Sequence, residues 1–120
     1  MELPQPGDRI LVLKEHWLNL IIKTGSTRKT MEIRGRALKG GVYWLGHKGF
    51  IRGKASLGDP VFIADVQTWA GLRERHRVMS DALPYRKTWG SPVLKARPVE
   101  PVRYIHPRGA VGIVRYRPKV

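Results

Sequence analysis

Three side chains that can do proton and anion chemistry fall within six residues of one another: Lys29, Glu32 and Arg34. A lysine that becomes buried loses part of its basicity and can then act as a base near neutral pH. A carboxylate and a guanidinium two residues apart on a strand share one face, so they can pair or hold a ligand's polar edge together. The segment is therefore a candidate site, with Lys29 as its base.

Each of these residues also has a simpler interpretation. Eight Lys and Arg lie between Arg28 and Lys54, and Glu32 is the only acid among them. Lys29 can contact phosphate or lay its stem along apolar surface, and Glu32 with Arg34 can form a structural salt bridge. A lone carboxylate in a cationic segment opposes phosphate binding, so Glu32 is expected to have a specific partner or task.

The chain as a whole is strongly basic. Its 120 residues carry 23 Lys and Arg against 9 Asp and Glu, a formal net charge of +14. Such a field attracts polyanions and steers their approach, so RNA or single-stranded DNA is the expected partner. An anionic membrane surface, or no polyanion at all, are the alternatives that the charge leaves open, and nothing in the sequence indicates a protein partner.

The composition excludes several kinds of site. The absence of cysteine rules out disulfides, zinc–thiolate and iron–sulfur centres and thiol nucleophiles. No two histidines have metal-ligand spacing and no phosphate-binding glycine loop occurs, so neither a metal nor a cofactor is expected. No apolar run approaches the roughly 20 residues of a membrane span, and residues 1–8 lack signal-peptide features. A soluble, cytoplasmic protein without membrane association is expected.

Periodicity predicts short elements around the candidate site. Helical spacing occurs over residues 15–24, with Gly25 placed to end the helix, and again over residues 69–78. Prolines 98, 101 and 107 are expected to break up the late part of the chain. Branched or alternating apolar runs and glycine-marked turns predict strands at residues 9–14, 29–34, 61–66, 93–94 and 110–116, and a hairpin over 40–54 with its tip at 47–49.

These elements predict an α+β fold, a small mixed β-barrel of about six strands with two short helices capping it. Residues 1–8 form an irregular lead-in and residues 9–120 a single domain. One closed sheet is expected, with Trp17 and Leu20 packed over it. Its buried alternating positions are expected to include Met31, Ile33, Val61, Ile63 and Val111.

Three segments of the chain match one known family in order. They are Gly-x-x-x-Lys-Thr-x-Glu-Ile-Arg at 25–34, Gly-Val-Tyr-Trp at 41–44 with Gly-Phe-Ile-Arg-Gly-Lys-Ala at 49–55, and a late block of Glu74-Arg-His-Arg77, Leu83-Pro-Tyr-Arg-Lys87, Trp89 and Tyr104-x-His-Pro-x-Gly-Ala-Val111. On these segments the chain resembles the ASCH domain family of the PUA-like superfamily. The resemblance implies a small β-barrel, a cleft beneath the first helix, and a role in binding RNA or another nucleic acid.

Some ASCH proteins resemble hydrolases, which remove the acyl group of acetylated cytidine or cut single-stranded RNA. The acetylcytidine-cleaving relatives have Lys-Thr-x-Thr where this chain has Glu32 in the last position. Those relatives also carry a glutamate after the second helix, and near the corresponding place this chain offers only Ser80 and Asp81. What the resemblance implies is a rearranged version of that site, with Lys29, Thr30 and Glu32 as candidate catalytic residues.

Further cations and aromatics complete a candidate nucleic-acid surface. Aromatic side chains near glycines, prolines or cations can stack a base, and a histidine among arginines is expected to stay neutral. A hairpin tip suits contacts to phosphate or a 2′-hydroxyl. The candidate binding residues are Arg28, Lys29, Glu32, Arg34, Tyr43, Trp44, His47, Lys48, Arg52, His76, Tyr85, Arg86, Lys87 and Trp89.

Three functions stay open on these grounds. The first is binding of RNA or single-stranded nucleic acid in a basic cleft beside the barrel. The second is a hydrolase, acting in the same cleft on a modified nucleoside or as a ribonuclease. The third is a non-enzymatic reader of a modified base, in which Glu32 accepts a hydrogen bond from the exocyclic amine of cytosine. An enzyme needs a closed pocket around Lys29, whereas a binder can be open.

Overall fold

The computed structural model describes residues 2–120. This part of the chain forms seven strands and three short helices. They are β1 (Arg9–Val12), α1 (Glu15–Ile22), β2 (Met31–Arg34), β3 (Gly41–His47), β4 (Phe50–Leu57), β5 (Val61–Ile63), α2 (Val66–Gly71), α3 (Arg73–His76), β6 (Thr88–Arg103) and β7 (Ile113–Arg115).

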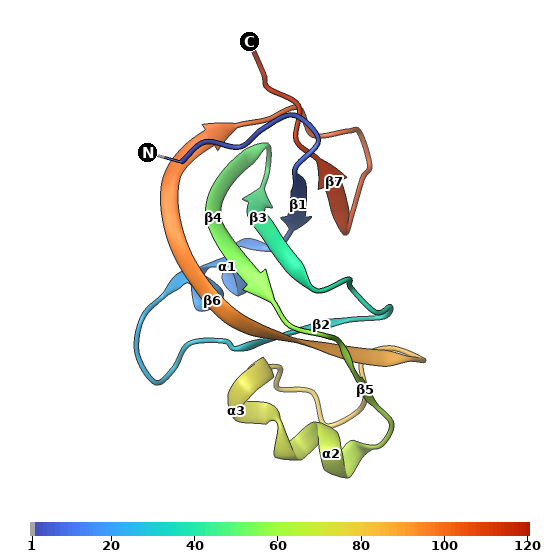
Figure 1. Ribbon diagram of the computed structural model, residues 1–120. Coiled ribbons are helices and arrows are strands. Elements are labelled where there is room, and N and C mark those ends of the chain that lie inside the picture. The colour runs from blue at the N-terminus through green and yellow to red at the C-terminus, as the bar shows by residue number, and fades with distance from the viewer. Residues whose placement is uncertain (1) are drawn as a thin grey trace.

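The strands form one curled mixed sheet in the order β2-β6-β4-β3-β1-β7, with β5 also paired to β6. Only β1 and β3 run parallel, and the other pairs described are antiparallel. Figure 1 shows β6 sweeping around the sheet from the helices to the opposite end. The expected α+β fold is confirmed, but the sheet is a half-barrel, because β2 and β7 at its two ends do not pair within residues 2–120.

Strand β6 is the largest departure from the expected elements. It is a single strand of 16 residues where the sequence predicts a short strand followed by proline-interrupted chain. Up to Pro92 it pairs with β2 or β5, whereas from Lys95 onward its register partners lie on β4 alone. A strand with one free edge can carry proline, because the missing N–H costs no ladder bond there. Pro98 and Pro101 therefore leave β6 intact.

The hairpin of β3 and β4 is present where the sequence predicts it. Lys48 and Gly49 form its two-residue turn, both with positive φ, as a tight hairpin turn requires. Helix α1 packs across this hairpin at Gly53, where an added Cβ would lie 2.7 Å from the side chain of Ile22. The glycine thus lets the helix approach the sheet closely. Helix α1 ends at Ile22, earlier than predicted, and Gly25 lies in the turn that follows.

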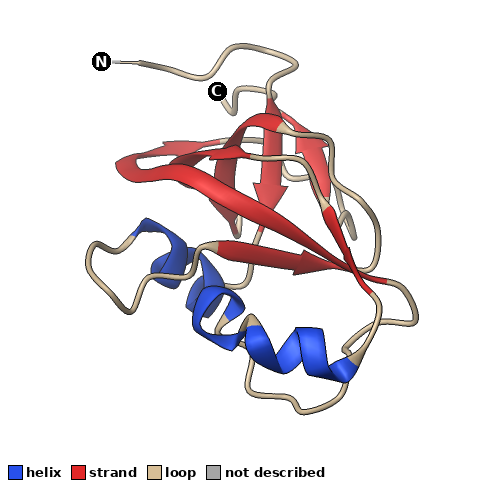
Figure 2. Cartoon of the chain, turned by 60° about the horizontal axis from the view of Figure 1, so that its bottom comes forward, coloured by secondary structure: helices blue, strands red, loops and turns tan. Residues whose placement is uncertain are grey.

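The second predicted helix is two helices. Asp65 caps α2, since its carboxylate accepts a hydrogen bond from the backbone N–H of Thr68 at 2.7 Å. The backbone leaves helical geometry at Leu72 and then forms α3. Helix α3 is followed by Arg77, whose backbone lies in the left-handed region. The preceding strand is correspondingly short, because residues 64–66 belong to the cap and start of α2. Figure 2 shows all three helices on the same side of the sheet.

Buried apolar side chains gather in three clusters. One lies beneath α1 and contains Leu18 and Ile21, a second surrounds Trp44 and Tyr104, and the third joins Met31, Ile33 and Ile63 to Trp69 of α2. The burial expected for Val61 and Val111 is wrong, since they are 48% and 85% exposed. Val61 lies on the short strand β5, and Val111 precedes β7 in a loop. Trp17 packs partly buried against the first cluster.

Candidate functional site

Strand β2 carries a buried ionic network. Lys29 and Glu32 are 1% and 4% exposed, and their charged atoms lie 3.7 Å apart. The Lys29 ammonium also donates to the backbone carbonyl of His76 at 2.6 Å. Arg34 donates from Nε to one Glu32 oxygen at 2.8 Å, and its Nη2 lies 2.7 Å from the same oxygen. Nη2 also donates to the carbonyl of Val12 at 3.0 Å. Both oxygens of the Glu32 carboxylate therefore have a cationic partner.

Burial changes the acid–base chemistry of Lys29. The pKa of Lys29 is lowered from the ordinary 10.5 to about 8, chiefly by loss of hydration; Glu32 opposes this shift, and the Arg34 charge adds to it. The ring of Trp17 lies 4.4 Å from the ammonium and covers another side of it. The lysine is therefore less basic than usual, but it is only 1% exposed and its ammonium is enclosed by the His76 carbonyl, Glu32 and the Trp17 ring.

His76 is fully buried behind Lys29. Its ring stacks on Trp69 with 3.8 Å between centroids. Nδ1 accepts from the backbone N–H of Val78 at 3.0 Å while Nε2 lies 2.9 Å from the carbonyl of Trp69, which fixes the neutral tautomer with its proton on Nε2. Burial lowers its pKa, and nearby Lys29 and Arg73 act in the same direction. The neutral state agrees with expectation, although burial is the larger cause.

Thr30 joins the network through its backbone. Its N–H donates to the carbonyl of Arg75 at 2.8 Å, and its carbonyl accepts from the N–H of Val93 at 2.8 Å. These two bonds attach the start of β2 to α3 on one side and β6 on the other. The candidate catalytic residues Lys29, Thr30 and Glu32 therefore lie close together, with Lys29 and Glu32 buried and Thr30 half-buried.

Arg34 connects this network to the surface. Its side chain is 19% exposed and contributes to a pocket of about 550 Å³. A second pocket adjoins the first at Gly35 and Tyr85. We call the two together the Tyr85 pocket; its lining is Arg34, Gly35, Arg36, Leu38, Tyr85, Arg86, Lys87 and residues 111–113. Four of these are cations and none is a carboxylate.

Tyr85 itself is 45% exposed. One side of its ring rests on Gly35, where an added Cβ would lie only 3.0 Å from the ring. A side chain at that position would displace the tyrosine, so the glycine is what permits this packing. Of the four aromatic residues that the sequence proposes for stacking, Tyr85 is the one with a large exposed ring beside cations.

Tyr43 and Trp44 cannot stack a base in this structure, because they are 1% and 3% exposed. The Tyr43 hydroxyl donates to the carbonyl of Lys39, and the indole N–H of Trp44 donates to Asp8 at 3.0 Å. Strand β3 is covered on both faces, so neighbouring residues that point in opposite directions are both buried. A prediction that one face of the strand is exposed to solvent is therefore wrong for β3.

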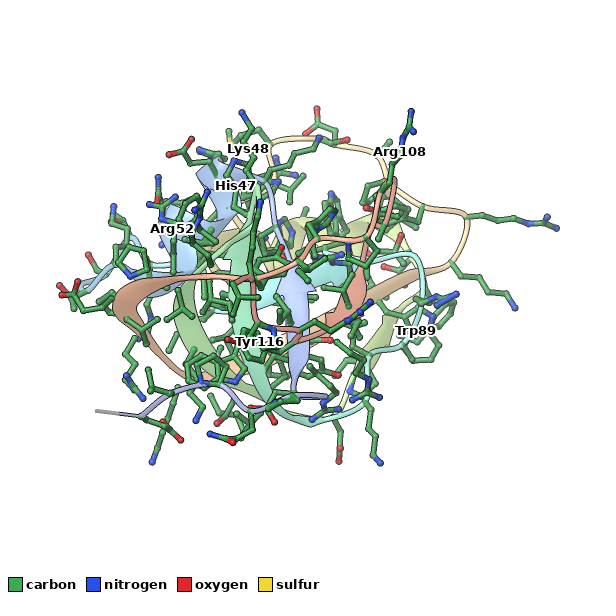
Figure 3. The ribbon with its side chains drawn as sticks, turned by 90° about the horizontal axis from the view of Figure 1, so that it is seen from above. His47, Lys48, Arg52, Trp89, Arg108 and Tyr116 are labelled. Atoms are coloured by element: carbon green, nitrogen blue, oxygen red, sulfur yellow. The ribbon has the colours of Figure 1, made fainter. Side chains whose placement is uncertain are left out.

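The remaining candidates lie in separate places. His47 donates from Nδ1 to the carbonyl of Leu13 at 2.8 Å, and Lys48 is exposed at the hairpin tip. Arg52 pairs with Asn19 at 3.0 Å and with Glu15 at 3.5 Å on α1. Figure 3 shows His47, Lys48 and Arg52 gathered on one side of the molecule and Trp89 on the other.

Two candidates belong to neither group. Trp89 is half-buried and packs at 5.1 Å between centroids against Phe62. Arg28 lines a different pocket, which it shares with Lys54 and Arg97. The single basic cleft predicted from sequence, with Arg28, Lys29, Arg34, Lys48 and Arg52 along it, is therefore divided among a buried network and several surfaces.

Sequence reasoning missed two contributors. Arg36 lines the Tyr85 pocket, and its position two residues after Arg34 was the available signal. Trp17 covers the Lys29 ammonium, which no local pattern indicates because the two lie on different elements. Among residues 2–120, no group of three His, Asp or Glu side chains has the arrangement of a metal site, and no helix has the length and apolar character to span a membrane.

Crystal structures with the same architecture come from Zymomonas mobilis. The ZmASCH protein superposes with a TM-score of 0.67 at 18% identity, over 92% of this chain and 88% of that one. A serine-to-alanine mutant of ZmASCH gives 0.69 at 18% identity over 96% and 92%, and a tyrosine-to-phenylalanine mutant gives 0.67 at 16% over 92% and 91%. No protein-family model and no curated protein matches the chain. At these identities the likeness establishes architecture, and the chain has the ASCH-like fold that its motifs indicate.

Proposed function

We propose that this protein binds RNA or single-stranded DNA at the Tyr85 pocket. The observation that carries the proposal is an exposed aromatic ring among four cations, Arg34, Arg36, Arg86 and Lys87, with no carboxylate in the lining. A base can stack on such a ring without sequence readout, while the cations neutralise the flanking phosphates. The net charge of +14 supplies the long-range attraction.

The other described pockets support this choice by contrast. Three other pockets all include Glu2 in their lining. Lys54 and Arg97 there are already paired with Glu2, so an incoming phosphate would first have to displace that carboxylate. In the Tyr85 pocket Arg34 is the one cation with an ion pair among residues 2–120, to the buried Glu32, and Arg36, Arg86 and Lys87 are exposed.

Burial weighs against the two alternatives. A hydrolase would need Lys29 to reach its substrate, and a modified-base reader would need a free oxygen on Glu32. Lys29 is 1% exposed and both Glu32 oxygens have cationic partners. The lowered pKa of Lys29 is the one observation that favours hydrolysis. Incubating the parent protein with acetylcytidine, and separately with labelled RNA, tests that alternative directly.

The binding proposal is tested by salt titration of labelled RNA and single-stranded DNA oligomers. Affinity should fall linearly on a log–log plot, with a slope of about −0.7 for each phosphate neutralised. Arg36→Gln and Lys87→Gln should each weaken binding and reduce the slope by about that amount. Lys119→Gln, which removes an exposed charge outside the pocket, is the matched control. A slope near zero, or equal effects of all three variants, would refute binding at this pocket.

A further inference from the structure

The N-terminal segment of residues 2–8 places the carboxylate of Glu2 against two cations of the sheet. In Figure 1 this segment crosses the upper part of β6 and β4 before it enters β1. The Glu2 carboxylate accepts from the Lys54 ammonium through one oxygen and from Arg97 Nη2 at 2.8 Å through the other. Glu2 thus bridges two cations that belong to different strands.

The register of the sheet places those two cations together. Lys54 of β4 lies directly opposite Arg97 of β6. Like charges at directly opposed positions destabilise a strand pair unless an anion neutralises them. Lys54 is further held by the Trp44 ring, 4.6 Å from its ammonium. The two strands therefore present a fixed pair of cations that requires an anion.

A pocket of about 520 Å³ adjoins this pair. Arg28, Lys95 and Ser56 line it together with Lys54 and Arg97, and Glu2 is the only carboxylate in its lining. Ser56 lies opposite Lys95 in the same ladder. Four cations against one carboxylate leave an excess positive charge, and the volume lies within the range that holds small ligands, about 300–1,000 Å³.

We propose that Lys54, Arg97, Lys95 and Arg28 form a second phosphate-binding site, which Glu2 occupies in place of the ligand. A phosphate group carries more negative charge than a carboxylate and matches the forked donors of two arginines. The site is separate from the Tyr85 pocket, with which it shares no lining residue. This proposal rests on the proposed function in one respect: it takes the phosphate to belong to a nucleic-acid backbone.

The contact with Glu2 is suited to exchange. Glu2 and Arg97 side chains are each 53% exposed, and pairs of this kind are weak. The hydrogen bond from Lys54 is the main cause that lowers the Glu2 pKa, so the carboxylate stays charged at neutral pH. A ligand must displace the Glu2 carboxylate, and the ligand's apparent affinity is its intrinsic affinity multiplied by the fraction of molecules in which Glu2 has left the site.

The direct test is an NMR titration with inorganic phosphate, followed at the Trp44 indole N–H. Glu2→Gln should tighten phosphate binding by about fivefold or more, as expected if the site is open in a fifth of molecules or fewer. Glu74→Gln changes the net charge equally at an exposed position on α3 and should have little effect. The double variant Glu2→Gln with Arg97→Gln should lose the gain. Equal behaviour of Glu2→Gln and Glu74→Gln would refute the site.

Two further arms identify the source of the phosphate. Labelled RNA should bind Glu2→Gln more tightly than the parent, with a steeper salt dependence, because more phosphates are neutralised. A glutamate-rich peptide should compete poorly; competition as strong as that of RNA would assign the site to acidic proteins instead and overturn the nucleic-acid source. If the parent and all variants fail to bind RNA while phosphate still titrates Glu2→Gln, the proposed function fails and the phosphate site stands.

Discussion

Two groups of cations in this protein have opposite surroundings. Lys29 and Arg34 share the buried carboxylate of Glu32, whereas Arg36, Arg86 and Lys87 surround an exposed Tyr85 with no acid in the pocket lining. The first group is satisfied by protein partners and stabilises the attachment of β2. The second group has unused charge at a surface. Residue type alone does not distinguish a structural cation from a ligand-binding one; counter-charge and burial do.

The comparison is tested most strongly by Glu32→Gln. Removing the carboxylate leaves the Lys29 ammonium buried and unpaired, and such changes cost about 3–5 kcal/mol. We expect a loss of about 3 kcal/mol in the free energy of unfolding, measured by urea denaturation at neutral pH. Glu74→Gln is the exposed control and should lie within about 0.5 kcal/mol of the parent. If Glu32→Gln leaves the stability unchanged but alters which RNA bases the protein prefers, Glu32 would instead contact a base, as the modified-base reader alternative requires.

The pH dependence of stability tests the burial of Lys29. The folded protein holds this proton with a pKa of about 8, whereas the ordinary value is 10.5. Unfolding therefore takes up a proton between these pH values, and the folded state gains stability as the pH rises through that window, by about 3 kcal/mol.

The measurement is the difference in unfolding free energy between the parent and Lys29→Met at a series of pH values. Other lysines and tyrosines titrate in both proteins, so their contributions cancel in the difference. The parent should improve relative to Lys29→Met from about pH 8 upward. A constant difference would mean that Lys29 is solvated and available, which would revive the hydrolase alternative.

Tyr85→Ala tests the exposed side of the comparison. Loss of one stacking platform costs about 1–3 kcal/mol of binding free energy per base, so we expect RNA affinity to fall by about 5- to 150-fold. Tyr85→Phe keeps the ring and should retain most of the affinity. Thermal unfolding of both variants controls for the contact with Gly35. If Tyr85→Ala binds as the parent does, the base is not stacked in this pocket.

His76 gives the smallest expected effect. Its pKa is lowered from 6.5, so the folded protein takes up this proton at a lower pH than the unfolded chain does. Stability should therefore decline as the pH falls below about 6.5, and protonation of Nδ1 would break the bond from Val78. Two-dimensional NMR of the imidazole nitrogens should show the Nε2–H tautomer at neutral pH. Titration of His76 at or above 6.5 would contradict the burial argument.

Local sequence determines several features of this protein on its own. The hairpin turn at Lys48–Gly49 follows from its glycine, α1 from its helical spacing, and the proximity of Lys29, Glu32 and Arg34 from their separation in the chain. The ordered motifs indicate the ASCH-like fold, which the superposition confirms. These features depend on neighbours within a few residues, so they can be predicted from the sequence.

Tertiary structure decided what those residues can do. Whether Lys29 faces solvent depends on Trp17 and on α3, which pack against it from distant parts of the chain, and Tyr43 and Trp44 are hidden because both faces of β3 are covered. Pro98 and Pro101 are compatible with a long strand only because that part of β6 has one free edge. Accessibility and counter-charge arise from long-range packing, and they separate the buried network from the Tyr85 pocket.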